Sequence, residues 1–139
     1  MAAVELLCDT GPLAAFFNRG DQFHSWAAEQ FERLSQPMLT CEAVISETVF
    51  LLLDDGLSPD PVFEAIERGA FQVRFSATEH WPDLRRLIRK YEELPMSLAD
   101  ACLVRMAEMA GNCQVFTTDR HFRIYRRHGR QIIPLLAPF

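Results

Sequence analysis

The residues best placed to do chemistry are four acids, Asp9, Glu47, Asp100 and Asp119, because each stands among apolar neighbours. Asp9 and Asp119 closely follow short apolar runs, whereas Glu47 and Asp100 have apolar residues one helical turn away. An unpaired carboxylate on an apolar face costs several kcal/mol, so these acids need partners. A shared divalent cation would be one such partner. Carboxylate oxygens without His or Cys select hard ions such as Mg²⁺ or Mn²⁺.

Each acid also has an ordinary structural interpretation. Asp9 and Asp119 could cap helices that start after them, and Ser97-Leu98-Ala99-Asp100 matches a capping box. Glu47 could be neutralised by an arginine, either Arg19 or Arg105. These four explanations are independent of one another, whereas a common metal site explains all four acids with one cause.

The sequence lacks the residues that several other classes of enzyme require. Asp9-Thr10-Gly11 is the tripeptide of aspartic proteases, but it occurs once and the segment turns into a helix. An aspartyl-phosphate phosphatase would need a second Asp where Gly11 stands. The sequence contains no glycine-rich phosphate loop, no H-E-x-x-H and no G-x-S-x-G.

Strands and helices are expected to alternate along the chain and so to position these acids. Predicted strands cover residues 4–8, 38–40, 71–75, 113–117 and 131–136. Predicted helices cover residues 12–17, 22–34, 42–53, a segment capped by Asp60, 78–91 and 97–110, with a short basic helix after residue 119. This order predicts an α/β fold of one domain over residues 1–139, a three-layer α/β/α sandwich with a central parallel sheet. The functional crevice of such a sheet lies outside the carboxyl ends of its strands, where Asp9 and Asp119 fall.

Composition supports an ordinary globular protein. The chain has 139 residues, of which 49% are hydrophobic and 24% charged, with a net charge of −5. The longest strictly apolar run, residues 49–53, is too short to cross a bilayer, so no membrane contact is expected. The acidic N-terminal segment does not resemble a signal peptide. Four cysteines without a C-x-x-C spacing predict buried free thiols, and therefore a cytoplasmic location.

A basic segment begins directly beside Asp119. It contains five arginines within eleven residues, namely Arg120, Arg123, Arg126, Arg127 and Arg130. Such a cluster could hold the phosphate backbone of a nucleic acid, and Arg120, Arg123, Arg126 and Arg127 are the candidate RNA-binding residues. The alternative is a solvated helix face that is merely rich in arginine.

Four ordered segments together resemble the PIN domain family, in particular its VapC-like branch of toxin ribonucleases. They are LLCDTGPLAAFF, CEAVISETVFLL, LPMSLADACLVRMAE and VFTTDRHF, and they span nearly the whole chain. The resemblance places the acidic quartet of the family on Asp9, Glu47, Asp100 and Asp119, and its auxiliary hydroxyl on Thr117. The sequence departs from the family after Thr10, where Gly11-Pro12 replaces the commoner Ser.

The resemblance implies hydrolysis of RNA phosphodiester bonds with Mg²⁺ or Mn²⁺. Asp9, Asp100 and Asp119 would hold the metal, Glu47 would ligate it or orient the attacking water, and Thr117 would position a carboxylate or phosphate oxygen. It also implies a toxin with a cognate antitoxin, and a homodimer, as in many family members. The alternative is a catalytically silent PIN-like module that binds RNA or protein.

Overall fold

The computed structural model describes residues 3–139, and its centre is a sheet of five parallel strands in the order β3-β2-β1-β4-β7. These strands are β1 (Glu5–Cys8), β2 (Met38–Thr40), β3 (Phe71–Val73), β4 (Cys113–Phe116) and β7 (Leu135–Leu136). β1 pairs with β4 over its whole length, from Glu5 opposite Cys113 to Cys8 opposite Phe116. The ends of β1 and β4 therefore lie side by side at one edge of the sheet.

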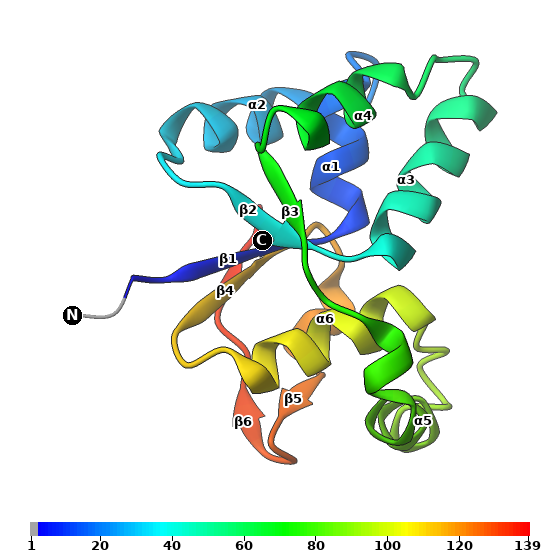
Figure 1. Ribbon diagram of the computed structural model, residues 1–139, viewed down its shortest axis with the longest axis vertical. Helices are drawn as coiled ribbons and strands as arrows, with labels where there is room; N and C mark the ends of the chain where they lie inside the picture. The colour runs from blue at the N-terminus through cyan, green and yellow to red at the C-terminus, as the bar shows by residue number, and fades with distance from the viewer. Residues whose placement is uncertain (1–2) are drawn as a thin grey trace.

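Helices cover both faces of the sheet, which confirms the predicted α/β/α sandwich (Figure 1). One layer contains α1 (Thr10–Phe17), α2 (His24–Arg33), α3 (Glu42–Asp54) and α4 (Asp60–Glu67). The other contains α5 (Trp81–Lys90) and α6 (Leu98–Met109), and α6 packs on β1 and β4. Leu7, Cys8, Val115 and Phe116 are buried because helices lie above and below them. Within residues 3–139 no helix is long and apolar enough to span a membrane.

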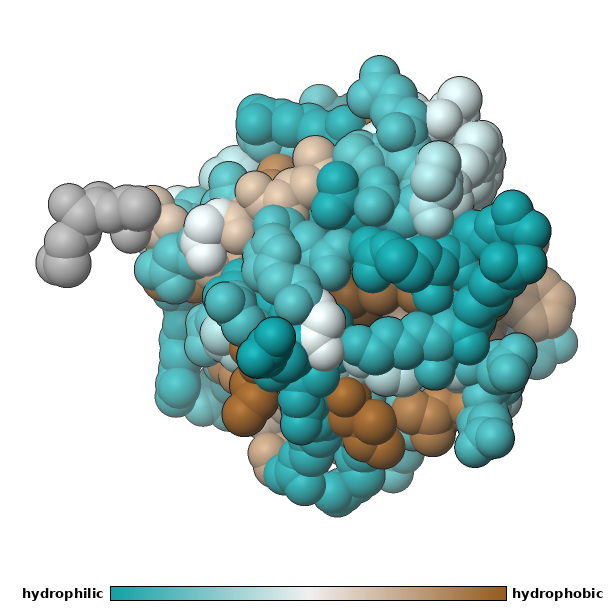
Figure 2. Space-filling view, turned by 90° about the horizontal axis from the view of Figure 1, so that it is seen from below, coloured by the Kyte–Doolittle hydropathy of each residue, from teal (hydrophilic) through white to brown (hydrophobic). Residues whose placement is uncertain are grey.

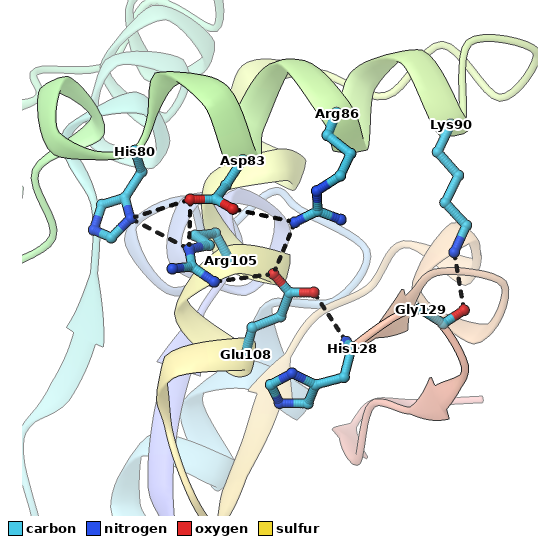
Figure 3. Close-up of polar contacts among 8 residues, drawn as sticks. All are labelled: His80, Asp83, Arg86, Lys90, Arg105, Glu108, His128 and Gly129. Atoms are coloured by element: carbon cyan, nitrogen blue, oxygen red, sulfur yellow. Dashed lines mark hydrogen bonds and ion pairs between the residues drawn. The ribbon is translucent and has the colours of Figure 1, made fainter.

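A network of charged side chains holds α5, α6 and the C-terminal hairpin together (Figure 3). Its centre is Glu108 of α6, which is 8% exposed. Arg105 and Arg86 lie 3.4 and 3.6 Å from its Oε1, and the N–H of His128 donates to its Oε2 at 2.9 Å. The surface seen from this side is mainly hydrophilic, with several separate apolar areas (Figure 2).

Two predicted elements are wrong in the second half of the chain. The helix predicted over residues 78–91 is divided into a 3₁₀ turn, η1 (Ala77–Glu79), and α5. Pro82 has no N–H to donate to the carbonyl of residue 78, so a continuous helix cannot form. The predicted edge strand over residues 131–136 is also divided, because Pro134 interrupts it. β6 (Gln131–Ile132) pairs with β5 (Arg126–Arg127) in an antiparallel hairpin, and only β7 joins the main sheet.

Local geometry explains two smaller corrections. The basic segment is not a regular helix, because it forms a 3₁₀ turn, η2 (Arg120–Arg123), and then the hairpin. The hairpin loop has positive φ at His128 and Gly129, 53° and 81°, and Gly129 adopts this conformation without strain. Asp60 is the first residue of α4 and not its cap. Its own N–H donates to the hydroxyl of Ser58 at 3.2 Å.

All four cysteines are buried free thiols, as predicted. They are Cys8, Cys41, Cys102 and Cys113. Burial raises the pKa of Cys8 and of Cys113, so both remain protonated.

Candidate active site

Asp9 lies at the junction of β1 and α1 and is only 5% exposed. Its Oδ1 accepts a hydrogen bond from the N–H of Thr10 at 2.8 Å, and its Oδ2 accepts one from the Thr117 hydroxyl at 2.7 Å. Burial, with the negative charges of Asp100 and Asp119, raises the pKa of Asp9 from 3.8 to about 7, although these hydrogen bonds oppose the rise. The metal-free protein therefore contains a carboxylate that is costly to ionise.

Thr117 joins two of the acids. Its buried hydroxyl donates to Asp9 and accepts a hydrogen bond from the N–H of Asp119 at 2.9 Å. It can do so because β1 and β4 are neighbours and end together, and the N–H of Asp9 itself donates to the Phe116 carbonyl at 2.9 Å. The structure thus places the Thr117 hydroxyl between Asp9 and Asp119, while its auxiliary role in a metal site stays a prediction.

Asp100 enters the same region from the first turn of α6. The N–H of Asp100 donates to the Ser97 hydroxyl at 3.0 Å, and the N–H of Ser97 donates to Asp100 Oδ2 at 3.3 Å, which completes the predicted capping box. Burial, followed by the charge of Asp119, raises the pKa of Asp100. Asp100 is therefore a helix cap and, at the same time, a member of an electrostatic cluster.

Asp119 follows β4 and caps η2, where its Oδ1 accepts from the N–H of His121 at 2.9 Å. The capping interpretation thus holds for Asp9, Asp100 and Asp119. The shared-site interpretation receives support as well, because the charges of Asp100 and Asp119 both raise the pKa of Asp9. At Asp100 and Asp119, capping and metal binding are not alternatives, because each capping carboxylate uses one oxygen and leaves the other free.

Glu47 lies in a different environment from the one predicted. It is exposed, and its neighbours Phe50 and Leu51 are also exposed, at 65% and 42%. Apolar residues surround α3, so sequence spacing did not reveal which face the helix buries. Among the described residues no arginine forms an ion pair with Glu47. It accepts a hydrogen bond from the Thr10 hydroxyl at 2.9 Å, next to Asp9.

The acids supply only oxygen donors to any cation that they could bind. Within residues 3–139 no three His, Cys, Asp or Glu side chains are gathered into a ready-made metal site. The donor chemistry nevertheless fits a hard ion, because Asp9, Asp100 and Asp119 are three carboxylates close enough to disfavour one another's charge. Asp100 Oδ1 and Asp119 Oδ2 accept no hydrogen bond from any residue that the structure describes. These two oxygens are free to bind a cation.

The arginines of the basic segment divide into two kinds. Arg120 and Arg123 are exposed beside Asp119, and their guanidinium groups stack on the Phe139 ring at 4.9 and 4.5 Å. Arg126 Nη1 donates to three backbone carbonyls between 2.7 and 3.1 Å, and Arg127 Nη1 donates to the Ala107 carbonyl at 3.2 Å. Arg126 and Arg127 thus stabilise the fold, whereas Arg120 and Arg123 remain accessible. RNA binding by these four arginines stays a prediction.

Gly11 faces Thr118, the residue between Thr117 and Asp119. A Cβ at this position would lie 2.0 Å from the hydroxyl oxygen of Thr118. The backbone N of Thr118 would be 3.6 Å away, which is an ordinary contact, so the obstacle to a side chain at position 11 is the Thr118 side chain.

Sequence reasoning missed Tyr125, whose hydroxyl donates to Asp100 Oδ2 at 3.2 Å. The available signal was a tyrosine in a polar segment, because its ring favours burial and its buried hydroxyl then requires a partner. The partner itself could not be predicted, because Asp100 lies 25 residues away.

Asp9 and Asp119 thus stand just after adjacent parallel strands of an α/β/α sandwich, where the functional crevice of such a sheet lies. The PIN domain family matches residues 6–127 of this chain, which therefore belongs to that family. The predicted resemblance is thereby confirmed.

Two relatives from Mycobacterium tuberculosis are similar over most of the chain. Ribonuclease VapC26 (strain ATCC 25618 / H37Rv) is 23% identical over 127 residues, which are 89% of this chain and 94% of that protein. The crystal structure of VapC20, described as a sarcin-ricin loop cleaving toxin, superposes with a TM-score of 0.74 at 21% identity. The match covers 84% of this chain and 91% of that one, and shows that the two share a fold.

Proposed function

We propose that this protein is a metal-dependent ribonuclease that hydrolyses RNA phosphodiester bonds and acts as the toxin of a toxin–antitoxin pair. The observation that carries the proposal is Asp9, buried at the end of β1 with a pKa raised by its burial and by the charges of Asp100 and Asp119. A cluster of this kind gains most from a cation that neutralises it. Membership of the PIN domain family and similarity to a protein named ribonuclease support the substrate class.

The metal would be Mg²⁺ or Mn²⁺, held by Asp9, Asp100 and Asp119. When bound, such an ion lowers the pKa of its water ligand and offsets negative charge on the phosphate. Thr117 keeps two of the carboxylates in fixed orientations, through 2.7 and 2.9 Å hydrogen bonds. Glu47, held by the Thr10 hydroxyl, would ligate the ion or accept a hydrogen bond from the attacking water.

The RNA would approach the site along the basic segment. Arg120 follows Asp119 in the chain and Arg123 ends the same 3₁₀ turn; both are exposed, and their contact with the Phe139 ring limits their freedom. Positive charge is needed there because the carboxylates repel the phosphates of the substrate. We therefore assign the contacts with the RNA phosphate backbone to these two arginines, with smaller contributions from Arg126 and Arg127.

Regulation would come from a cognate antitoxin, and many PIN toxins also form homodimers. Apolar side chains exposed on α3 and α4 offer a surface for such a protein partner, including Phe50, Leu53 and Phe63 at 65%, 57% and 45% exposure. The buried free thiols fit a reducing compartment, so we place the activity in the cytoplasm.

The deciding experiment compares cleavage of an RNA substrate by wild type, Asp100→Asn and Asp54→Asn with Mn²⁺ and with excess chelator. Asp54 is exposed on α3 and serves as the matched acidic control. We expect cleavage by wild type and Asp54→Asn only with metal, and at least a 100-fold loss for Asp100→Asn. Cleavage in excess chelator, or full activity of Asp100→Asn, would refute the assignment. RNA binding without cleavage by wild type would favour the silent module.

A further inference from the structure

Tyr125 contacts Asp100 directly, although it lies outside the acidic quartet. Its hydroxyl donates to Asp100 Oδ2 at 3.2 Å, and its side chain is fully buried. The N–H of Ser97 donates to the same oxygen at 3.3 Å. Oδ2 is therefore engaged twice, whereas Oδ1 accepts no hydrogen bond from the described residues.

The ring of Tyr125 is fixed by its neighbours. The ring packs edge-on against Tyr91 and Phe122, with ring centroids 5.0 and 5.1 Å away. The backbone N–H of Tyr125 donates to the His121 carbonyl at 3.1 Å. The fixed ring keeps the hydroxyl oxygen beside Asp100, and only the direction of its O–H bond can change. Since an unpaired buried hydroxyl is costly, its hydrogen bond to Asp100 is favoured.

The segment after Tyr125 is fixed to the same helix that carries Asp100. Tyr125 directly precedes β5, and the hairpin loop is bound to α6 through the N–H of His128 on Glu108 Oε2 at 2.9 Å. Lys90 of α5 donates to the Gly129 carbonyl, also at 2.9 Å (Figure 3). The segment that follows Tyr125 is therefore held against both α5 and α6.

We infer that Tyr125 is a positioning residue, whose hydroxyl holds one oxygen of Asp100 and leaves the other free to bind the divalent ion. This inference rests on the proposed function, because it requires Asp100 to be a metal ligand. Hydrogen-bond partners of metal ligands orient them, and removing such a partner commonly weakens metal binding 10- to 100-fold.

The test is a Mn²⁺ titration of wild type, Tyr125→Phe, Tyr91→Phe and Asp100→Asn, with free Mn²⁺ followed by electron paramagnetic resonance. Tyr125→Phe keeps the ring and removes the hydroxyl, so we expect about 10- to 100-fold weaker Mn²⁺ binding. Raising Mn²⁺ should restore kcat, while KM for RNA stays unchanged. Tyr91→Phe is the matched control, because the Tyr91 hydroxyl accepts from the N–H of Arg126 and contacts none of the acids. It should bind Mn²⁺ like wild type.

The arms separate this inference from the function on which it rests. Wild-type Mn²⁺ affinity in Asp100→Asn would refute the metal site, and the role of Tyr125 with it. Loss of binding in Asp100→Asn, together with unchanged binding in Tyr125→Phe, would overturn only the role of Tyr125. An equal loss in Tyr91→Phe would also overturn it, because the effect would then come from packing of the ring pair. If Tyr125→Phe melts below wild type, the titration is performed below its transition, so that affinity is still measured on folded protein.

Discussion

The strongest test of the electrostatic cluster is the pH dependence of stability in metal-free protein, compared between wild type and Asp9→Asn. The pKa of Asp9 in the folded state is about 7, well above its ordinary value of 3.8. The folded protein therefore binds the proton more tightly than the unfolded chain does. The stability that protonated Asp9 provides is complete below about pH 4 and is lost as the pH rises through 7.

The size of the effect follows from the same two pKa values. One pKa unit is worth about 1.4 kcal/mol, so ionising Asp9 should remove about 4 kcal/mol of stability between pH 4 and 8. Asn resembles the protonated acid, because its amide can donate to the Thr117 hydroxyl. Asp9→Asn should therefore match wild type near pH 4 and exceed its free energy of unfolding by about 4 kcal/mol at pH 8.

The assay is urea denaturation with excess chelator, at several pH values between about 4.5 and 8.5, followed by circular dichroism. Asp54→Asn serves as the control, because its exposed side chain should give a difference from wild type that is small at every pH. A difference between Asp9→Asn and wild type that stays constant with pH would refute the reasoning. Asp9 would then ionise like an ordinary aspartate, and the three carboxylates would not disfavour one another's charge.

Three further predictions concern the metal, the RNA and the close approach at Gly11. Wild type and Asp119→Asn are each melted with chelator and with millimolar Mn²⁺, and Mn²⁺ should raise the melting temperature of wild type more. Asn can replace Asp119 as the cap of η2, so the variant should still fold. Equal melting curves in all four samples would count against a metal site. The double variant Arg120→Gln, Arg123→Gln should bind RNA more weakly. The slope of log binding constant against log salt concentration should fall by about 1.4, as measured by fluorescence anisotropy. The control is the double variant Arg33→Gln, Arg68→Gln, which changes two exposed arginines that precede strands. An unchanged slope in the Arg120/Arg123 variant would exclude contacts of these two residues with the RNA backbone. Gly11→Ala should destabilise the protein by about 1–3 kcal/mol in denaturation, and Thr118→Ala should restore part of this loss, because the new methyl meets the Thr118 hydroxyl. Absence of any rescue would show that the strain lies elsewhere.

The pattern of residue types along the chain was enough to predict the layers of the fold and the position of three acids. Strands and helices alternate, and a parallel sheet buries both faces of its strands, so the apolar runs before Asp9 and Asp119 were recognisable as central strands. Their carboxylates had to lie at the carboxyl edge of the sheet. The helix cap at Ser97 and Asp100 was equally predictable, because a capping box forms within one helical turn.

Packing between the elements determines which side chains are exposed and which are brought together. α3 is apolar around most of its circumference, so only its packing on α1 and α6 shows that Val44 and Leu52 are inside and that Glu47 faces outward. The contact between Tyr125 and Asp100 joins two residues 25 positions apart, and the Thr10–Glu47 hydrogen bond joins two that are 37 apart. Sequence periodicity describes one element at a time, whereas these contacts depend on the distances between elements, which packing alone determines.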